Sequence, residues 1–346
     1  MKALRILIIA GLAWLVSPNL VSAQGCAPPK SDEGVSVFGF IQPQFETKFT
    51  GDGTRNAFTF NRARIGVTGL IPYDFLYYAV IETSAFKDSN PFLLDAFISY
   101  QRFSFAKISI GQFKSPFTLE MSTPCSELNT IYRTSTVNDL VSPDRDLGVM
   151  VSGSFKDNLL SYSLALTNGT GKGVFDNNLG KTIHSRVVLK PLSFVKIGGG
   201  VQYGTHPPFV DTIPDEDQRF RWAFDLQLKH KNFDIIGEYV YGNDKGSYVV
   251  GGGCGGTPEI KSGDLRRSGY YITAMYKTPW NIQPVFRYEN WNTNLNEENA
   301  YEQIMVFGLN YWFNDWTRMQ VNYLYKAEKK FEVKNDELVV QFQIVF

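Results

Sequence analysis

The chain has 346 residues, and its 34 lysines and arginines balance its 34 aspartates and glutamates. This balance argues against nucleic acid as a partner, because binding to a phosphate backbone needs a basic excess. Aromatic residues are abundant, with 27 Phe, 18 Tyr and 6 Trp, yet after the first residues no run approaches the roughly 18 consecutive apolar residues of a membrane-spanning helix, which excludes spanning by helices.

The first 23 residues predict a secretory signal peptide. Lys2 and Arg5 precede an apolar run from Ile6 to Val16, and Val21-Ser22-Ala23 forms a small-residue site after which we expect cleavage. A retained transmembrane anchor is the weaker alternative, because the run is too short to span a bilayer. A lipoprotein with Cys26 lipidated is also weaker, because Ala23 stands where an aliphatic residue is required.

After an expected tail over residues 24–34, the apolar pattern has a period of two almost everywhere. In RFRWAFDLQLKH (219–230) every second residue from Phe220 to Leu228 is apolar, while polar residues fill most of the positions between them. Strict alternation predicts strands with one apolar face. No stretch of the body predicts a helix.

About sixteen such segments follow one another, each about ten residues long. Each boundary carries an error of about two to four residues, so a total of about fourteen or about eighteen strands is also compatible with the pattern. The expected starts are Val35, Ala57, Phe75, Leu93, Ala106, Asp146, Leu159, Thr182, Phe194, Phe220, Phe233, Arg267, Ile282, Tyr301, Thr317 and Glu337.

The connectors between these segments alternate in length. Long polar or glycine-rich stretches include NGTGKGVFDNNLGK, THPPFVDTIPDEDQ and GNDKGSYVVGGGCGGTPEIKSGD. The tight ones are Pro72-Tyr73-Asp74, Lys156-Asp157-Asn158, Lys231-Asn232, Thr278-Pro279-Trp280 and Asn314-Asp315. Tight turns at one end and long loops at the other are typical of a transmembrane β-barrel, whereas a soluble sandwich has no reason to sort its loops in this way.

The two faces of the strands favour the same architecture. The apolar faces would meet lipid, the charged faces would meet water inside a wide pore, and closure would remove the sheet edges that lipid cannot hydrogen-bond. Residues 35–346 therefore predict an all-β fold, a transmembrane antiparallel barrel whose last strand, LVVQFQIVF, pairs with residues 35–45. Several aromatic residues fit interfacial girdles, namely Tyr77, Tyr78, Tyr270, Tyr271, Tyr311 and Trp312.

Three segments resemble the phosphate-selective porin O and P family in the same order. They are FNRARIGVTGLI, GQFKSPFTLE and RDLGVMVSG, and the resemblance covers about Phe38 to Gly153. It implies a sixteen-stranded trimeric channel in the bacterial outer membrane, with basic residues along an anion path. By motif, Arg62 and Arg64 fall in the first segment, Lys114 in the second and Arg145 in the third. The chain departs from the family in lacking a dense set of lumenal arginines and central lysines. The aromatic C-terminal strand also resembles the signal read by the barrel assembly machinery.

The connector from Lys114 to Arg145 is far longer than the others, and structureless loops of that length are usually functional. With the N-terminus in the periplasm it is the third external loop, which is similar in position to the loop that general diffusion porins fold into the channel. We therefore expect it to fold inward as a constriction. An exposed surface loop is the alternative.

Charged residues on the water-facing side predict the selectivity of the pore. Basic residues lead modestly, which predicts weak anion selectivity; the equally weighted alternative is that many of them form ion pairs along the wall and contribute no net field. The expected anion path consists of Arg62, Arg64, Lys107, Lys114, Arg133, Arg145, Arg186, Arg219, Arg221, Arg287 and Arg318.

The long connector carries its own acids. We expect Glu120, Glu127 and Asp139 to act at the constriction, opposite wall arginines such as Arg62 and Arg64. The tripeptide Asp144-Arg145-Asp146 is more simply interpreted as an anchor for the connector's return to the next strand.

Other motifs carry little chemistry. Cys125 and Cys254 could pair in an exported protein, or stay two unpaired loop thiols. NGTGKG lacks the spacing of a phosphate loop, and His184, His206 and His230 lack metal-ligand spacing.

The sequence as a whole predicts a porin for small hydrophilic solutes or anions, with no cofactor, no metal and no enzymatic activity. Its expected partners are outer-membrane lipid, the assembly machinery and two further copies of itself. A non-selective porin, a barrel enzyme with a catalytic group near its rim and a soluble secreted sandwich are the alternatives.

Overall fold

The computed structural model describes residues 35–71, 74–84, 90–156, 158–176, 178–206, 217–250, 259–329 and 332–346, with the side chains of 206, 217, 247–250 and 259–262 left out. The expected signal peptide (1–23) and N-terminal tail (24–34) lie outside the described residues, so both remain predictions.

Sixteen strands make up almost all of the regular structure. In the first half of the chain they are β1 (Ser36–Thr50), β2 (Gly53–Ile71), β3 (Phe75–Glu82), β4 (Phe92–Phe103), β5 (Ala106–Lys114), β6 (Arg145–Phe155), β7 (Leu160–Thr167) and β8 (Thr182–Leu192). In the second half they are β9 (Val195–His206), β10 (Asp217–His230), β11 (Phe233–Val250), β12 (Glu259–Tyr276), β13 (Ile282–Asn292), β14 (Tyr301–Asn314), β15 (Thr317–Glu328) and β16 (Glu337–Val345).

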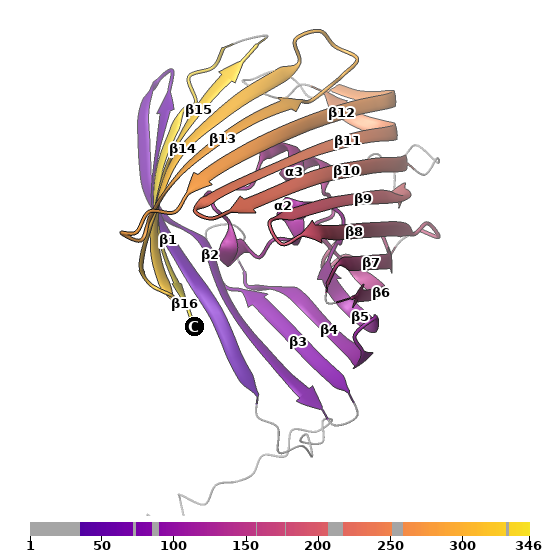
Figure 1. The fold of residues 1–346 in the computed structure, drawn as a ribbon. Helices are drawn as coiled ribbons and strands as arrows, with labels where there is room; N and C mark the ends of the chain where they lie inside the picture. Colours follow the sequence, from indigo (N-terminus) through magenta and orange to yellow (C-terminus); the bar gives the residue numbers. More distant parts are fainter. Residues whose placement is uncertain are drawn as a thin grey trace, which may run out of the picture. The chain divides into compact units, whose positions relative to one another are not determined.

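The strands form one closed antiparallel barrel, in which each strand pairs with its neighbours in sequence and β1 pairs with β16 (Figure 1). The closing register runs from Phe40 opposite Val345 to Lys48 opposite Glu337. Gly39 and Phe346 exchange two backbone hydrogen bonds of 2.8 and 2.9 Å. Closure leaves no free sheet edge, and it confirms the predicted barrel and the predicted partner of the last strand.

The two faces of the strands differ as the alternating pattern predicts. On β10, Phe220 and Phe224 are 44% and 52% exposed, whereas Arg221 and Asp225 are 1% and 0% exposed. On β16, Phe342 is 46% exposed and Gln341 is 1% exposed. The apolar series therefore points outward and the polar series points to the inside of the barrel.

The tight connections are confirmed where they are described. β10 ends at His230 and β11 begins at Phe233, with Lys231 between them in the left-handed region at φ 54°. Asp74, Lys156 and Asn281 adopt the same left-handed backbone conformation at other tight connections, with φ of 72°, 47° and 60°. These positive φ values let a short turn reverse the chain.

One predicted boundary is wrong. β12 begins at Glu259 and not at Arg267, because Gly242 to Val250 of β11 pairs with Glu259 to Arg267 of β12. Backbone pairing in this hairpin continues well past the apolar pattern, which glycines and polar residues interrupt. Much of the stretch expected as a loop is therefore strand.

The connector between β5 and β6 contains two short α-helices and one 3-10 turn, where the sequence predicted no helix. They are α2 (Leu119–Ser122), η1 (Cys125–Glu127) and α3 (Ser135–Leu140). Thr118 and Thr134 cap the two α-helices by accepting hydrogen bonds from the backbone N–H of Met121 and Val137. Neither helix has the length or the apolar composition that crossing a membrane would require, and none of the described residues forms one that does.

Apolar side chains of this connector pack against the wall in two clusters. Phe117, Met121, Val137, Leu140 and Val141 contact Ala223, Val240, Tyr271 and Trp291 of β10 to β13. Ile131 packs with Ile304, Val306, Leu324 and Val339 of β14 to β16. The connector is therefore held by apolar contacts at two separate points, and Figure 1 shows α2 and α3 near β8 to β12.

Candidate functional site

The 115–144 segment, which joins β5 to β6, hydrogen-bonds to the polar side chains of the barrel wall. Amide side chains make most of the contacts to its middle part. Asn322 accepts from the backbone N–H of Ile131 at 2.8 Å. Amide groups donate to backbone carbonyls of the segment in six further bonds: Gln42 to Cys125 (3.5 Å), Asn61 to Ile131 (3.3 Å), Asn310 to Asn129 (2.9 Å), Gln320 to Leu128 (3.3 Å) and to Asn129 (3.4 Å), and Gln343 to Ser126 (3.1 Å).

Wall carboxylates bind the starts of the two helices. Glu238 of β11 accepts hydrogen bonds from the backbone N–H groups of Leu119 at 2.5 Å and Glu120 at 3.1 Å. Glu289 of β13 accepts from the backbone N–H of Thr136 at 3.1 Å. A carboxylate placed there satisfies amides that a helix leaves unpaired and complements its dipole.

Five of the arginines expected along an anion path form ion pairs with carboxylates. The pairs are Arg64–Glu82 (2.8 Å), Arg145–Asp95 (3.1 Å), Arg186–Asp225 (2.7 Å), Arg221–Asp244 (2.9 Å) and Arg287–Glu120 (3.5 Å). Arg145 also contacts Asp144, and Arg287 also contacts Glu289. Paired in this way, these guanidinium groups contribute little net charge to the interior.

The remaining predicted cations have other surroundings. Arg62 donates to the side chain of Gln42, Arg318 to that of Gln343, and Arg219 to the carbonyl of Ser142. Arg133 and Lys114 both donate to the carbonyl of Thr123. Lys107 is half-buried near the tight connection between β4 and β5.

The three acids of the segment do not share one location. Glu120 is buried and accepts from the backbone N–H and hydroxyl of Thr134, besides its ion pair with Arg287. Asp139 is exposed and pairs with Arg267 at 2.7 Å. Glu127 is exposed and lines the cavity described below. Within the described residues, none of the three forms an ion pair with Arg62 or Arg64.

The return of the segment to β6 is fixed by Asp144-Arg145-Asp146. Arg145 and Lys172 hold the pKa of Asp144 below its usual value, although burial alone would raise it. The carboxylate of Asp146 accepts hydrogen bonds from the backbone N–H groups of Gly169 and Gly171 in the NGTGKG run. The glycine run therefore holds one of the protein's own carboxylates.

Cys125 is a free and buried cysteine at the start of η1. Cys254 lies outside the described residues, so pairing of the two thiols remains an expectation. Arg64 and Arg133 each donate to the sulfur of Cys125 at 3.1 Å.

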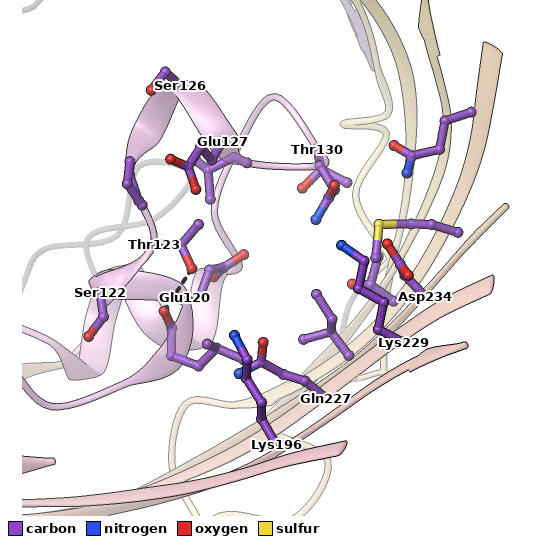
Figure 2. A pocket seen from close by; sticks show the side chains of 18 of the residues that line it. Glu120, Ser122, Thr123, Ser126, Glu127, Thr130, Lys196, Gln227, Lys229 and Asp234 are labelled. Carbon is purple, nitrogen blue, oxygen red and sulfur yellow. Dashed lines mark hydrogen bonds between the residues drawn. The ribbon is translucent and has the colours of Figure 1, made fainter. Parts of the chain in front are cut away.

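A cavity of about 1140 Å³ lies between the segment and the wall, on the side of the tight connections. Figure 2 shows Lys196, Gln227, Lys229 and Asp234 of the wall together with residues of the segment that include Glu120 and Glu127. The charged lining consists of six cations (Arg186, Lys190, Lys196, Lys229, Lys277 and Arg318) and four acids (Glu120, Glu127, Asp234 and Asp315). Ser122, Thr123, Ser126 and Thr130 add hydroxyl groups, and the charged part of the lining has a basic excess.

Two sets of these residues were missed from the sequence. The amides of β1, β2 and β14 to β16 carry no charge, so a prediction based on charge assigns them no role beyond the polar face, although Gln and Asn recur there at every second position (Gln42, Gln44, Gln320, Asn322, Gln341 and Gln343). The lysines Lys190, Lys196 and Lys277 lie at or near strand ends, where a lysine is easily taken for a turn residue. Recurrent amides on neighbouring strands would have been the signal for the first set.

The closed barrel of sixteen strands, with its apolar exterior and polar interior, is the architecture of outer-membrane porins. Solved structures of this class share the fold. OmpF of Salmonella typhi, in complex with daunomycin, is 14% identical, with 90% of this chain and 97% of that chain covered and a TM-score of 0.68. OmpT of Vibrio cholerae in its trimer form is 12% identical, with 91% and 100% covered and a TM-score of 0.66. The outer-membrane channel DcaP of Acinetobacter baumannii is 13% identical, with 93% and 100% covered and a TM-score of 0.63.

Within this class, residues 42–198 match the family phosphate-selective porin O and P, which confirms the resemblance seen in the sequence. The match extends past Gly153, to the start of β9. No curated protein matches the chain. The family and the fold together support an outer-membrane porin, and they point to a channel rather than an enzyme.

Proposed function

We propose that this protein is a porin through which small hydrophilic solutes diffuse passively, with a weak preference for anions. The excess of cations over acids in the cavity beside the 115–144 segment carries the proposal. Fixed charges along a pore bias which ions enter it. Lys190, Lys196, Lys229 and Lys277 form no ion pair with a described carboxylate, so their charge is available to passing solutes.

We further propose that the 115–144 segment narrows the channel. Its support is the anchoring described above: amides hold its middle, carboxylates hold its helices, and two apolar clusters fix it to the wall. A segment bound at so many points keeps a constant position, which a fixed channel diameter requires.

A non-selective porin is the second candidate, and the ion pairs favour it. Arg64, Arg145, Arg186, Arg221 and Arg287 are all neutralised by carboxylates. If the cavity lysines are equally screened by water and salt, the channel has no net preference.

Reversal potentials across a potassium chloride gradient in planar bilayers separate the two candidates. We expect a potential of the sign that chloride preference gives, and we expect the double variant Lys196→Gln with Lys229→Gln to reduce it. Lys334→Gln, an exposed lysine between β15 and β16, is the matched control and should leave the potential unchanged. A potential near zero or of the opposite sign contradicts the anion preference, whereas the absence of open steps contradicts a porin and favours a filled enzymatic barrel.

Phosphate is the anion that the family name suggests. Phosphate added to the same bilayers should block chloride current more strongly than sulfate does if the channel selects phosphate. Equal effects of the two anions would leave a general porin.

We also propose that the mature chain begins after Ala23, is inserted into the bacterial outer membrane by the barrel assembly machinery, and forms a homotrimer there. The trimer form of the similar Vibrio cholerae OmpT supports the last point. Sequencing of the mature N-terminus and native mass spectrometry in detergent check the cleavage site and the trimer.

A further inference from the structure

Four cationic side chains surround Cys125 where the 115–144 segment meets β2. Arg62 and Arg64 come from β2, Lys114 ends β5, and Arg133 comes from the segment itself. We call these five residues the Cys125 cluster.

Only one of the four cations has a carboxylate partner among the described residues. Arg64 pairs with Glu82 at 2.8 Å. Arg62 and Arg133 are only 7% and 9% exposed, and neither of them, nor Lys114, forms an ion pair with a described carboxylate. Buried cations without a counter-charge are costly, and the single carboxylate paired here, Glu82, leaves this part of the wall with an excess of positive charge.

The sulfur of Cys125 is where two of these cations converge. Arg64 and Arg133 each direct an Nη1–H at it from 3.1 Å, and the thiol is 5% exposed. Arg133 cannot turn elsewhere easily, because it also donates to the backbone carbonyls of Glu120 and Thr123. A thiolate accepts such hydrogen bonds well, whereas a neutral thiol is a weak acceptor.

We propose that Cys125 is held as a thiolate that serves as the counter-ion of the cluster, and that it is a modification site for small electrophilic solutes. The electrostatics agree: burial alone would raise the pKa of the Cys125 thiol, but Arg62, Arg64, Arg133 and Lys114 hold it well below its usual range. Cys125 does not itself line the large cavity, but its chain neighbours Pro124 and Ser126 do, so a small solute in the cavity would have to pass only these neighbours to reach the thiol.

The chemistry of the modification is a simple substitution. With iodoacetamide as the probe, the thiolate sulfur attacks the methylene carbon, a C–S bond forms, the C–I bond breaks and iodide leaves with its electron pair. No proton is released, because the thiol has already lost it. The neutral thioether removes one negative charge from the cluster and should shift the channel toward anions.

Alkylation of the full chain in detergent tests the thiolate, in a background of Cys26→Ser and Cys254→Ser that leaves only Cys125. An ordinary thiol has a pKa of about 8.5, so its alkylation slows roughly tenfold for each pH unit below that value. We expect the rate in the folded chain, followed by mass spectrometry, to change less than about threefold between pH values of about 8 and 6. The same chain in urea should recover the ordinary slope. An ordinary slope in the folded chain, or no adduct while the unfolded chain reacts, overturns the proposal.

A second pair of variants tests the counter-ion. Cys125→Ser removes the negative charge, so the reversal potential should shift in the direction that a stronger preference for chloride gives. Cys125→Asp keeps the charge and should retain the original potential. Equal potentials for Cys125→Ser and the unchanged chain would refute the counter-ion role. The alkylation assay needs no conductance, so failure of the proposed porin function and failure of this inference are distinguishable.

Discussion

Single polar side chains on the barrel wall determine where the 115–144 segment lies. Glu238 is the clearest case, because its carboxylate is 3% exposed and accepts from two backbone amides of the segment and from the hydroxyl of Tyr271. Inside a protein such a group must be paired, since a buried polar group without a partner costs free energy. The start of α2 therefore depends on one residue of β11.

Replacing Glu238 by Gln should loosen the segment. The amide group offers one acceptor oxygen in place of two, so a buried N–H loses its partner at a cost of about 1–3 kcal/mol. We expect a lower unfolding temperature and noisier open-channel current. Glu298→Gln, at an exposed glutamate between β13 and β14, is the control and should change neither quantity. If Glu238→Gln matched that control in both measurements, the carboxylate would not anchor α2.

At the scale of single residues, the sequence predicted which face of a strand each charged side chain occupies, but it did not predict the carboxylate with which each arginine pairs. Arg62, Arg64, Arg186, Arg221 and Arg287 were all expected on the polar face, and alternation alone suffices for that. Which carboxylate neutralises Arg186 or Arg221 depends on strand register, which alternation does not determine. The amides that hold the segment carry no charge, so only their recurrence at every second position of neighbouring strands could have indicated their role.

At the scale of whole elements, the 115–144 segment lies close against strands β9 and β12. A methyl group on Gly200 would fall on the backbone carbonyl oxygens of Phe117 and Ser185. On β12, a methyl group on Gly269 would likewise meet the hydroxyl of Thr136. Glycine at these two wall positions lets the segment lie directly against the sheet.

Gly200→Ala should therefore displace the start of the segment. Backbone atoms cannot give way as a flexible side chain can, and overpacking of this kind typically costs about 1–3 kcal/mol. We expect a lower unfolding temperature and a changed single-channel conductance. Gly237→Ala on β11, where the nearest atom lies 3.6 Å from the added methyl group, is the matched control. An unchanged conductance in Gly200→Ala would show that the segment does not set the width of the channel.

The strands were predictable because each one alternates and is bounded by a turn. The exception is the β11–β12 hairpin, whose pairing from Gly242 to Val250 continues without an apolar pattern. The helices were not predictable, because α2 and α3 span only four and six residues. Helices that short do not form alone in water, and the wall carboxylates that bind them are far away in the sequence.

At the scale of the whole molecule, the apolar pattern with its period of two explains both the closed barrel and the separation of an apolar outer face from a polar inner face. Lipid can solvate the outward series, which includes Phe220, Phe224 and Phe342, but cannot hydrogen-bond a free sheet edge. Pairing of β1 with β16 removes that edge. The alternation along the strands therefore determines the barrel architecture, whereas the ion selectivity of the channel depends on how individual charged side chains are paired.

The most direct test of this account uses two native tryptophans on opposite faces. Trp222 of β10 is 37% exposed on the outer face, whereas Trp291 of β13 is 4% exposed and packs against the segment. Variants that retain one of the two, with the other tryptophans changed to Phe, are reconstituted in bilayers whose acyl chains carry bromine. The account predicts strong quenching of Trp222 fluorescence and little quenching of Trp291. Strong quenching of Trp291 with Trp222 unaffected would contradict it, because the apolar series would then face the interior and the polar series the lipid.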